Sequence, residues 1–173
     1  MTDVLHLGCG DHHMENAINV DYRRTPAVDE IVDLNDYPWP WVENSMRYII
    51  MEHLLEHLDS VEQALRECAR ILKPNGRLRV VWPMGMNECA DPDHKHSWIW
   101  DTPEMYCGKR DWDVDVGLEV AHRNVVLHSH FSPPVNALHQ GLLRTVEAIE
   151  GQGRWMFDMP VTSGEFTVVF KKP

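Results

Sequence analysis

The sequence predicts an α/β fold of three layers, built on a doubly wound and mostly parallel sheet. Five short stretches rich in Val, Ile and Leu lie in the first half of the chain, each bounded by polar or turn residues, as is typical of strands buried on both faces. An amphipathic helix precedes the last of them, and an alternating pattern near the end of the chain predicts an antiparallel hairpin. A chain of 173 residues, 43% of them hydrophobic, can bury one full core. We therefore expect a single domain over residues 1–173.

The five buried strands are expected early in the chain, with turn residues between them. Their ranges are 4–7, 18–20, 31–32, 48–51 and 78–82. Only residues 11–17 separate the turn after the first strand from the second strand, whereas a parallel crossover takes about a dozen residues or more. The first crossover helix is therefore expected to be missing or very short. Part of one sheet face then lacks its helix, and we expect the late part of the chain, or a second copy in a homo-oligomer, to cover it.

Two amphipathic helices are predicted, one in each half of the chain. The first spans residues 60–72, where apolar side chains recur at helical spacing. Asp59 or Ser60 is its expected cap, and Gly76 follows its end. The second helix is expected over residues 135–149.

The stretch at about residues 84–134 has no sustained periodicity and is rich in Pro, Trp and His. A loop of this length within a compact domain is more often functional than idle, so we expect this insertion to form the acceptor side of a site. A short helix is expected to open at residues 102–104. The closing hairpin is predicted from residues 154–159 and 165–171.

The chain is strongly acidic, with 27 Asp and Glu against 16 Lys and Arg and a formal net charge of -11. Most of such a surface repels a phosphate backbone, so nucleic acid is a disfavoured partner. No apolar stretch approaches the roughly 20 residues needed to cross a bilayer, so no membrane partner is expected. The four cysteines are unevenly spaced and predict no disulfide framework, which favours reduced thiols and a cytoplasmic location.

The polar and glycine residues that follow the first three strands indicate a ligand site. Gly8-Cys9-Gly10 forms a glycine turn after the first strand, where the backbone can approach a ligand closely. Asp21 ends the second strand, where a carboxylate can accept both hydroxyls of a ribose. Asp33 and Leu34 follow the third strand and offer an acceptor and an apolar contact for an adenine ring. Ligands of open α/β sheets bind outside the carboxyl ends of the strands, so these residues are expected to act together.

With two further segments, MEHLLEH at residues 51–57 and ARILKPNGRL at 69–78, this pattern closely resembles the class I S-adenosylmethionine-dependent methyltransferases. In particular it is similar to a shortened subgroup in which a G-C-G turn leads almost directly to an N-V-D strand. The resemblance implies a Rossmann-like sheet, S-adenosylmethionine as cofactor and methyl transfer as the activity. The cofactor contacts that it implies are Gly8, Cys9, Gly10, Asp21, Asp33, Leu34 and Met51.

A protonated acceptor would need a general base, and His53 is the residue that we expect to serve. It follows the fourth strand, and a histidine there would face the methyl group, with Glu52 or His94 behind it. The acceptor itself is not identified by the sequence; a small molecule, a sugar or a protein fits the acidic surface better than DNA or RNA does.

Other functions fit parts of the pattern. His53, Glu56 and His57 match the H-x-x-E-H motif of zinc peptidases, but a helix cap follows closely and leaves little room for a metal-bearing helix. A non-catalytic module that binds S-adenosylmethionine as a regulatory or partner subunit is a further alternative. A nicotinamide dehydrogenase is disfavoured because its fingerprint needs a glycine where His13 stands.

Histidine-rich stretches raise the question of a metal elsewhere in the chain. Asp91, Asp93, His94 and His96 form one such group, and His128 and His130 form another. Neither has the spacing of a known ligand set, so no metal ligand is assigned from the sequence.

Overall fold

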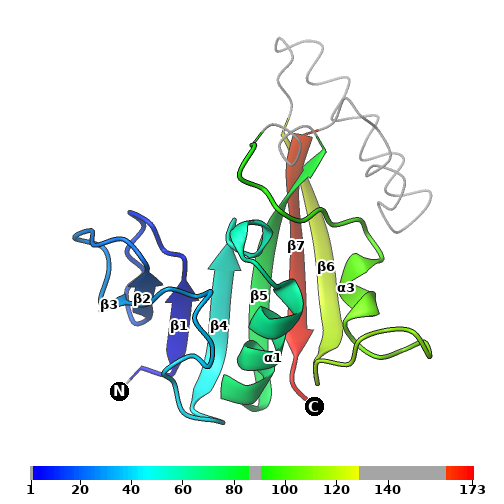
Figure 1. Ribbon diagram of the computed structural model, residues 1–173, viewed down its shortest axis with the longest axis horizontal. Helices are drawn as coiled ribbons and strands as arrows, with labels where there is room; N and C mark the ends of the chain where they lie inside the picture. Colours follow the sequence, from blue (N-terminus) through cyan, green and yellow to red (C-terminus); the bar gives the residue numbers. More distant parts are fainter. Residues whose placement is uncertain (1, 86–90, 129–162) are drawn as a thin grey trace.

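A computed structural model describes residues 2–85, 91–128 and 163–173, which form a seven-stranded mixed sheet in the order β3-β2-β1-β4-β5-β7-β6 (Figure 1). The strands are β1 (Val4–Leu7), β2 (Ile18–Asp21), β3 (Glu30–Ile31), β4 (Met46–Glu52), β5 (Leu72–Gly85), β6 (Glu119–His128) and β7 (Ser163–Lys171). The helices are the 3-10 helix η1 (Leu55–His57), α1 (Val61–Ile71) and α3 (Thr102–Met105). None of these helices is long and apolar enough to cross a membrane.

The first five strands are parallel, and each lies at or around the range predicted for it. Leu7 of β1 is in register with Val20 of β2 on one side and with Met51 of β4 on the other. The carboxyl ends of these three strands therefore meet at the same edge of the sheet. This register brings the glycine turn after β1 next to Asp21 and to the segment that follows β4.

Helix α1 connects β4 with β5 and forms where the sequence predicts it. Ser60 is its N-cap, since its side chain accepts a hydrogen bond from the backbone nitrogen of Gln63 at 3.2 Å. The helix ends at Ile71, and Leu72 is already extended. Its apolar stripe is buried against the sheet; the buried residues are Val61, Ala64, Leu65, Cys68, Ala69 and Ile71.

The antiparallel strands expected at the end of the chain are present. β7 lies between β5 and β6 and is antiparallel to both. Its other neighbour, β6, comes from the stretch predicted as a loop, because the first half of β6 carries polar residues such as His122, Arg123 and Asn124, which interrupt any sustained apolar pattern. The strand predicted at 154–159 and the helix predicted at 135–149 lie outside the described residues.

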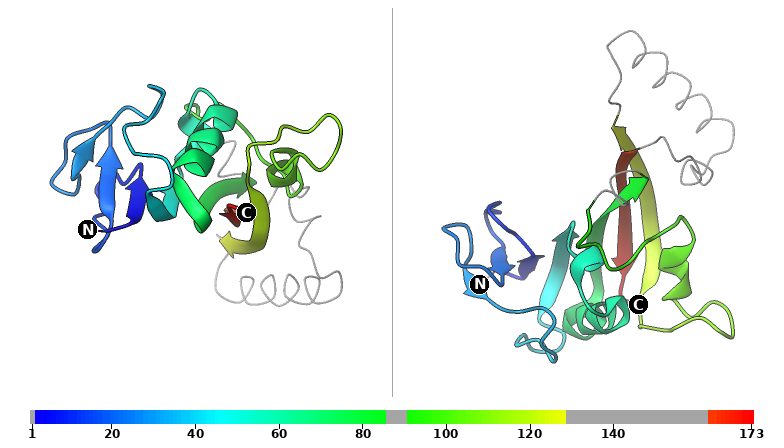
Figure 2. Two further views of the ribbon diagram at one scale, coloured as in Figure 1. Left: turned by 90° about the horizontal axis from the view of Figure 1, so that it is seen from below. Right: turned by 45° about the horizontal axis from the view of Figure 1, so that its top comes forward.

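The described helices lie on one face of the sheet. Figures 1 and 2 show α1 and α3 on the same side, and the connection between β1 and β2 contains no helix, as predicted. Within ranges 2–85, 91–128 and 163–173 the fold therefore has two layers, and a second helical layer is not formed by these residues. That the late part of the chain or a second copy covers the other face stays a prediction.

Part of the insertion predicted at residues 84–134 belongs to the core. Trp98 is 1% exposed and stacks on Trp82 of β5, with 4.4 Å between the ring centroids and 5° between the planes. It also meets Phe170 of β7 edge-on at 6.4 Å. By contrast Trp112 is 78% exposed. The segment that carries Trp98 thus takes the place of a helix over the antiparallel end of the sheet.

Candidate functional site

A cavity of about 680 Å³ opens at the carboxyl edge of the parallel strands. This volume lies within the range of about 300–1,000 Å³ that is usual for cofactor and small-molecule sites. The residues that line it are Gly8, Asp21, Tyr22, Arg23, Val32, Asp33, Leu34, Asn35, His53, Leu54, His57, Leu58, Pro92, Asp93 and Lys95. Five of the residues predicted from the sequence are among them: Gly8, Asp21, Asp33, Leu34 and His53.

Gly8 allows the backbone and the segment after β4 to approach each other. Its φ is +68°, and a methyl group added at its Cα would lie 2.8 Å from Cδ1 of Leu54. Any other residue would be strained here both by its backbone and by this contact. The turn after β1 is thus held against Leu54, which the sequence analysis did not single out.

Asp21 links the end of β2 to the glycine turn. Its side chain is buried, at 4% exposure for the residue, and Oδ2 accepts a hydrogen bond from the backbone nitrogen of Gly10 at 2.9 Å. Oδ1 accepts one from the backbone nitrogen of Arg23, also at 2.9 Å. Nε of Arg23 donates a further hydrogen bond to Oδ1 at 3.4 Å. A carboxylate has about four lone-pair positions, so about one remains, on Oδ2, for a hydroxyl group of a ligand. The carboxylate therefore both shapes the turn and can bind a ribose.

The next part of the cavity wall combines apolar and acidic groups. Val32 and Leu34 provide the apolar surface, and Leu34 is 5% exposed. Asp33 is exposed, and its Oδ1 accepts a hydrogen bond from the backbone nitrogen of Asn35 at 2.9 Å. This combination fits a flat heteroaromatic ring with an amino group.

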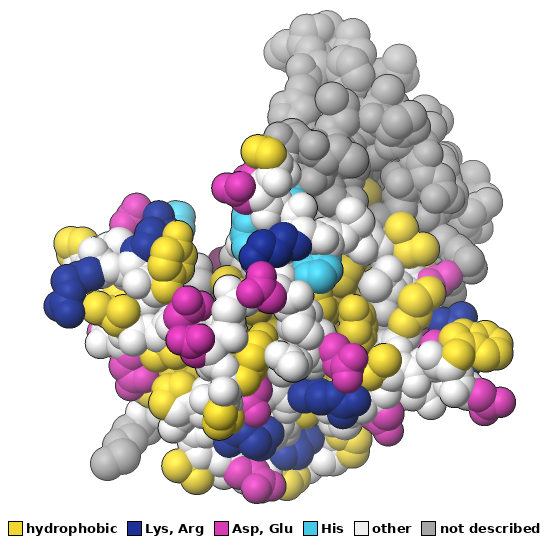
Figure 3. Space-filling model, in the orientation of Figure 1, with side chains coloured by type: hydrophobic (Ala, Val, Ile, Leu, Met, Phe, Trp, Pro, Cys, Tyr) yellow, Lys and Arg dark blue, Asp and Glu magenta, His cyan; other side chains and the backbone are white. Residues whose placement is uncertain are grey.

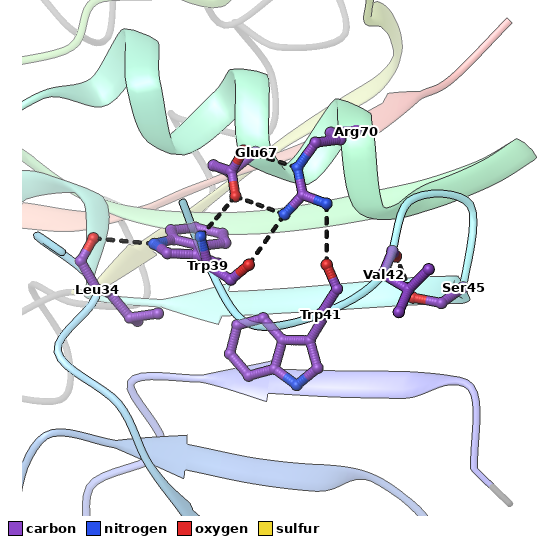
Figure 4. A network of polar contacts seen from close by, with 7 residues as sticks. All are labelled: Leu34, Trp39, Trp41, Val42, Ser45, Glu67 and Arg70. Atoms are coloured by element: carbon purple, nitrogen blue, oxygen red, sulfur yellow. Dashed lines mark hydrogen bonds and ion pairs between the residues drawn. The ribbon is translucent and has the colours of Figure 1, made fainter. Parts of the chain in front are cut away.

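A polar network on α1 positions this wall (Figure 4). Glu67 accepts hydrogen bonds from Arg70 at 2.7 and 2.8 Å and from the backbone nitrogen of Trp39 at 2.7 Å. Arg70 in turn donates to the carbonyl oxygens of Trp39 and Trp41 at 3.1 and 2.9 Å. The indole nitrogen of Trp39 then donates to the carbonyl oxygen of Leu34 at 3.1 Å. Hydrogen bonding to Arg70, helped by the Trp39 backbone, lowers the pKa of Glu67.

Three of the predicted cofactor contacts do not line the cavity. Cys9 is 3% exposed, and burial with Asp21 nearby raises the pKa of its thiol, so it is not a reactive thiolate. Gly10 supports the site through its bond to Asp21. Met51 is fully buried and lies in the core beside Leu7.

His53 also lines the cavity, and its φ is 51°. Its Nε2 is 3.2 Å from Oε1 of Glu165 in β7, and its Nδ1 is 3.6 Å from Oε1 of Glu56. These carboxylates, Glu56 first, raise the pKa of His53. Glu165 is separated from His53 by more than a hundred residues, so no local motif could have identified it.

The residues expected behind His53 have other neighbours. Glu52 forms an ion pair with Arg79, and His94 packs edge-on against His57 with 4.8 Å between the ring centroids. That Glu52 or His94 supports His53 stays a prediction.

The zinc-peptidase arrangement of His53, Glu56 and His57 is not formed. Such a motif needs two histidines one turn apart on the same face of an α-helix. Here η1 contains only three residues, and His53 lies before it in a left-handed backbone conformation.

Comparisons with known proteins agree with this geometry. Residues 11–80 match a family model described as a methyltransferase domain. No curated protein matches the sequence. Among solved structures, an S-adenosylmethionine-dependent methyltransferase from Archaeoglobus fulgidus is similar, with 17% identity, a TM-score of 0.64 and coverage of 99% of this chain and 86% of that one. A putative methyltransferase from Bacillus halodurans gives 13% identity, a TM-score of 0.64 and coverage of 98% and 92%.

The fold is also found in a protein with a different reaction. The [4+2]-cyclase SpnF is 15% identical, with a TM-score of 0.57 and coverage of 98% of this chain and 74% of that one. Structural likeness at such identities shows the fold alone. The family model covers residues 11–80, which is less than half of the chain, so that segment is similar to a methyltransferase domain. The solved structures show that the chain has the fold of S-adenosylmethionine-dependent methyltransferases, with the sheet order β3-β2-β1-β4-β5-β7-β6.

Proposed function

We propose that the chain, as one domain over residues 1–173, transfers the methyl group of S-adenosylmethionine to a small polar acceptor bound beside His53. The observation that carries this proposal is that a single cavity is lined by residues of both expected roles. Its lining contains Gly8, Asp21 and Leu34 as well as His53 and Lys95. A donor and an acceptor can therefore occupy the same cavity side by side.

The donor would lie against Gly8, Asp21 and Leu34. Asp21 would accept a hydrogen bond from a ribose hydroxyl through its remaining lone pair. Leu34 and Val32 would contact the adenine ring, and Asp33 would accept a hydrogen bond from its amino group. Gly8 would let the methionine part approach the backbone. When bound, S-adenosylmethionine supplies an electrophilic methyl group with a neutral thioether as its leaving group.

The protein's contribution to the reaction is alignment and proton removal. Holding the acceptor in line with the methyl carbon can supply roughly 7–11 kcal/mol of the barrier reduction. As the acceptor's lone pair forms the new bond to carbon and the bond to sulfur breaks, His53 would take the acceptor's proton. Glu56 and Glu165, at 3.6 and 3.2 Å from the ring nitrogens, would stabilise the imidazolium that results.

A hydroxyl or amine on a small molecule or sugar is the acceptor class that fits best. The lining also carries His57, Asp93 and Lys95, which can hydrogen-bond polar groups. The net charge of -11 opposes a polyanion. On the face shown in Figure 3, basic side chains are dispersed among acidic ones and form no continuous basic area.

The location proposed for this activity is the cytoplasm. Cys9, Cys68 and Cys107, the cysteines within the described part of the chain, are free thiols, which supports a reducing compartment.

Calorimetry with S-adenosylhomocysteine and a labelled-methyl assay test the proposal together. The wild-type chain should bind S-adenosylhomocysteine, and Asp21→Asn should weaken binding about tenfold or more, because the Asn amide cannot accept all the hydrogen bonds that the carboxylate accepts. Asp111→Asn, in an exposed loop, is the matched control and should bind as the wild type does. Binding without methyl transfer to any of a panel of small alcohols, amines and sugars would favour a non-catalytic module instead.

A further inference from the structure

Three potential metal ligands meet beside the cavity. One ligand atom from each of Glu56, His57 and His94 lies within 4.8 Å of the others. Glu56 and His57 belong to η1, and His94 comes from the later segment that starts at Asp91. A hydrogen bond of 2.7 Å from the backbone nitrogen of Lys95 to the carbonyl oxygen of Glu56 joins the two segments. The cluster is thus held together by the backbone and does not rest on side chains alone.

Glu56 is the unusual member of this cluster. Its side chain is fully buried, and among the described residues neither carboxylate oxygen has a hydrogen-bond partner. Nδ1 of His53 lies 3.6 Å from Oε1, close enough for an ion pair but too far for a good hydrogen bond. A buried carboxylate without a hydrogen-bond partner is strongly unfavourable. Its environment is therefore incomplete, and a bound cation would complete it.

The two histidines are arranged so that they can donate lone pairs. Nδ1 of His57 is 3.3 Å from the carbonyl oxygen of Asp93, and a proton shared there leaves Nε2 with its lone pair. A backbone carbonyl in this role is typical of metal-binding histidines. His94 is mostly buried, with 10% of its side chain exposed, and its Nε2 is 3.9 Å from Oδ2 of Asp91. Both rings are therefore already fixed near the carboxylate.

We propose that Glu56, His57 and His94 bind a divalent transition-metal cation, with Zn²⁺ as the best match. Two imidazoles and one carboxylate are a ligand set for zinc and its neighbours, whereas Mg²⁺ and Ca²⁺ prefer oxygen ligands. In tetrahedral coordination, ligand atoms at about 2.0–2.2 Å from zinc lie about 3.3–3.6 Å apart. The three ligand atoms lie within 4.8 Å of one another, so side-chain rotations that close them by about 1 Å would complete the site.

Three protein ligands leave at least one coordination position open. Of the three ligands His57 lines the cavity, so the proposed cation site adjoins the cavity through His57. A cation there would take a water molecule or an oxygen of the acceptor, and would lower the pKa of that oxygen. This role for the cation rests on the proposed methyl transfer, whereas the cation site itself does not.

Metal titration of the full-length chain tests the site. The chelator-treated wild type should bind Zn²⁺ in calorimetry and Co²⁺ in visible absorption, and Zn²⁺ should raise its melting temperature. Glu56→Gln and His94→Gln should each lower the affinity for both Zn²⁺ and Co²⁺ by about 10- to 100-fold or more. Each should also abolish the rise in melting temperature that Zn²⁺ causes in the wild type. His122→Gln removes an exposed histidine from β6 and should leave metal binding unchanged, which controls for adventitious binding by surface histidines.

Two outcomes would overturn the inference. One is a wild-type chain that binds neither metal at sub-millimolar concentrations, which would leave Glu56 as a buried structural acid. The other is equal binding by the wild type, Glu56→Gln and His94→Gln. S-adenosylhomocysteine binding is measured on the same samples, so that loss of the metal site and loss of the methyl-donor site are distinguished. Should Glu56→Gln fail to fold, His94→Gln alone decides the question.

Discussion

The carboxylate of Asp21 lies 2.9 Å from the backbone nitrogen of Gly10, so the end of β2 holds the turn that follows β1. These two elements form part of the proposed nucleoside site. Because the hydrogen bond is internal to the protein, the turn is formed before any ligand arrives. A change at either residue should therefore affect the shape of the site as well as its direct contacts.

Gly8→Ala should weaken S-adenosylhomocysteine binding about tenfold, because the new methyl group would displace Leu54 from the cavity wall. It should also cost about 1 kcal/mol of stability, since the φ of +68° is unfavourable for alanine. Gly117→Ala is the matched control: its φ is +77°, but the nearest neighbour of an added methyl is 3.9 Å away and lies outside the cavity lining. Calorimetry and thermal melting of both variants separate the two effects. Equal losses of affinity would show that Leu54 is not involved.

Glu67→Gln should destabilise the fold by about 1–3 kcal/mol, because it breaks the hydrogen bonds that join α1 to Trp39. It should also weaken S-adenosylhomocysteine binding slightly, since Trp39 supports Leu34. Glu62→Gln removes an exposed ion pair with Arg66 and should change stability by less than about 0.5 kcal/mol. Urea unfolding measures the free energy of unfolding of both variants. If the two are equally stable, the hydrogen bonds of Glu67 do not hold the cavity wall at Leu34 in place.

The same carboxylate predicts a dependence of stability on pH. Hydrogen bonding to Arg70 holds the pKa of Glu67 in the folded chain below its ordinary value of 4.5, so the folded state favours the ionised form. Its contribution to stability is present in full above the unfolded pKa and is lost as the pH falls through the folded pKa. The wild type should therefore lose stability on acidification below about pH 4.5, and Glu67→Gln should lose less. Parallel losses in the two proteins would argue against this role.

His53→Ala should lower turnover by about 10²- to 10⁴-fold once an acceptor is known, with little effect on binding of S-adenosylhomocysteine. Glu165→Gln removes one of the two carboxylates near the imidazole and should give a smaller decrease. The labelled-methyl assay measures turnover, and calorimetry measures binding. Unchanged turnover in His53→Ala would remove the general-base role.

Trp98→Ala should destabilise the protein by about 3–5 kcal/mol, because it removes a fully buried ring that stacks on Trp82. Trp112→Ala should be nearly neutral, since that ring is 78% exposed. Thermal or urea unfolding compares them. A small effect of Trp98→Ala would mean that the segment after Asp91 is not part of the core.

The parallel half of the fold was predictable because its signals are local. Strands such as Val4–Leu7 are continuous apolar runs between turn residues, and α1 carries both a cap at Ser60 and a regular apolar stripe. The shortened first crossover followed from the few residues available to it. The antiparallel half was harder, because β6 is an edge strand whose polar residues face solvent.

The residues of the candidate site likewise include some with local sequence signals and others without them. Gly8, Asp21 and Leu34 follow strands directly, so the fold class places them at one edge. Glu165 and Lys95 reach the site only through tertiary packing, and no spacing in the sequence relates them to His53. Met51 was placed at the cofactor from the family resemblance, but the alternation of side chains along β4 directs it into the core.

A crystal structure of the full chain with S-adenosylhomocysteine tests the central claim most directly. The account predicts that a ribose hydroxyl contacts Asp21, that the adenine lies against Leu34, and that the sulfur lies on the side of the cavity where His53 stands. A nucleoside bound away from the glycine turn, or no binding at saturating concentration, would contradict it.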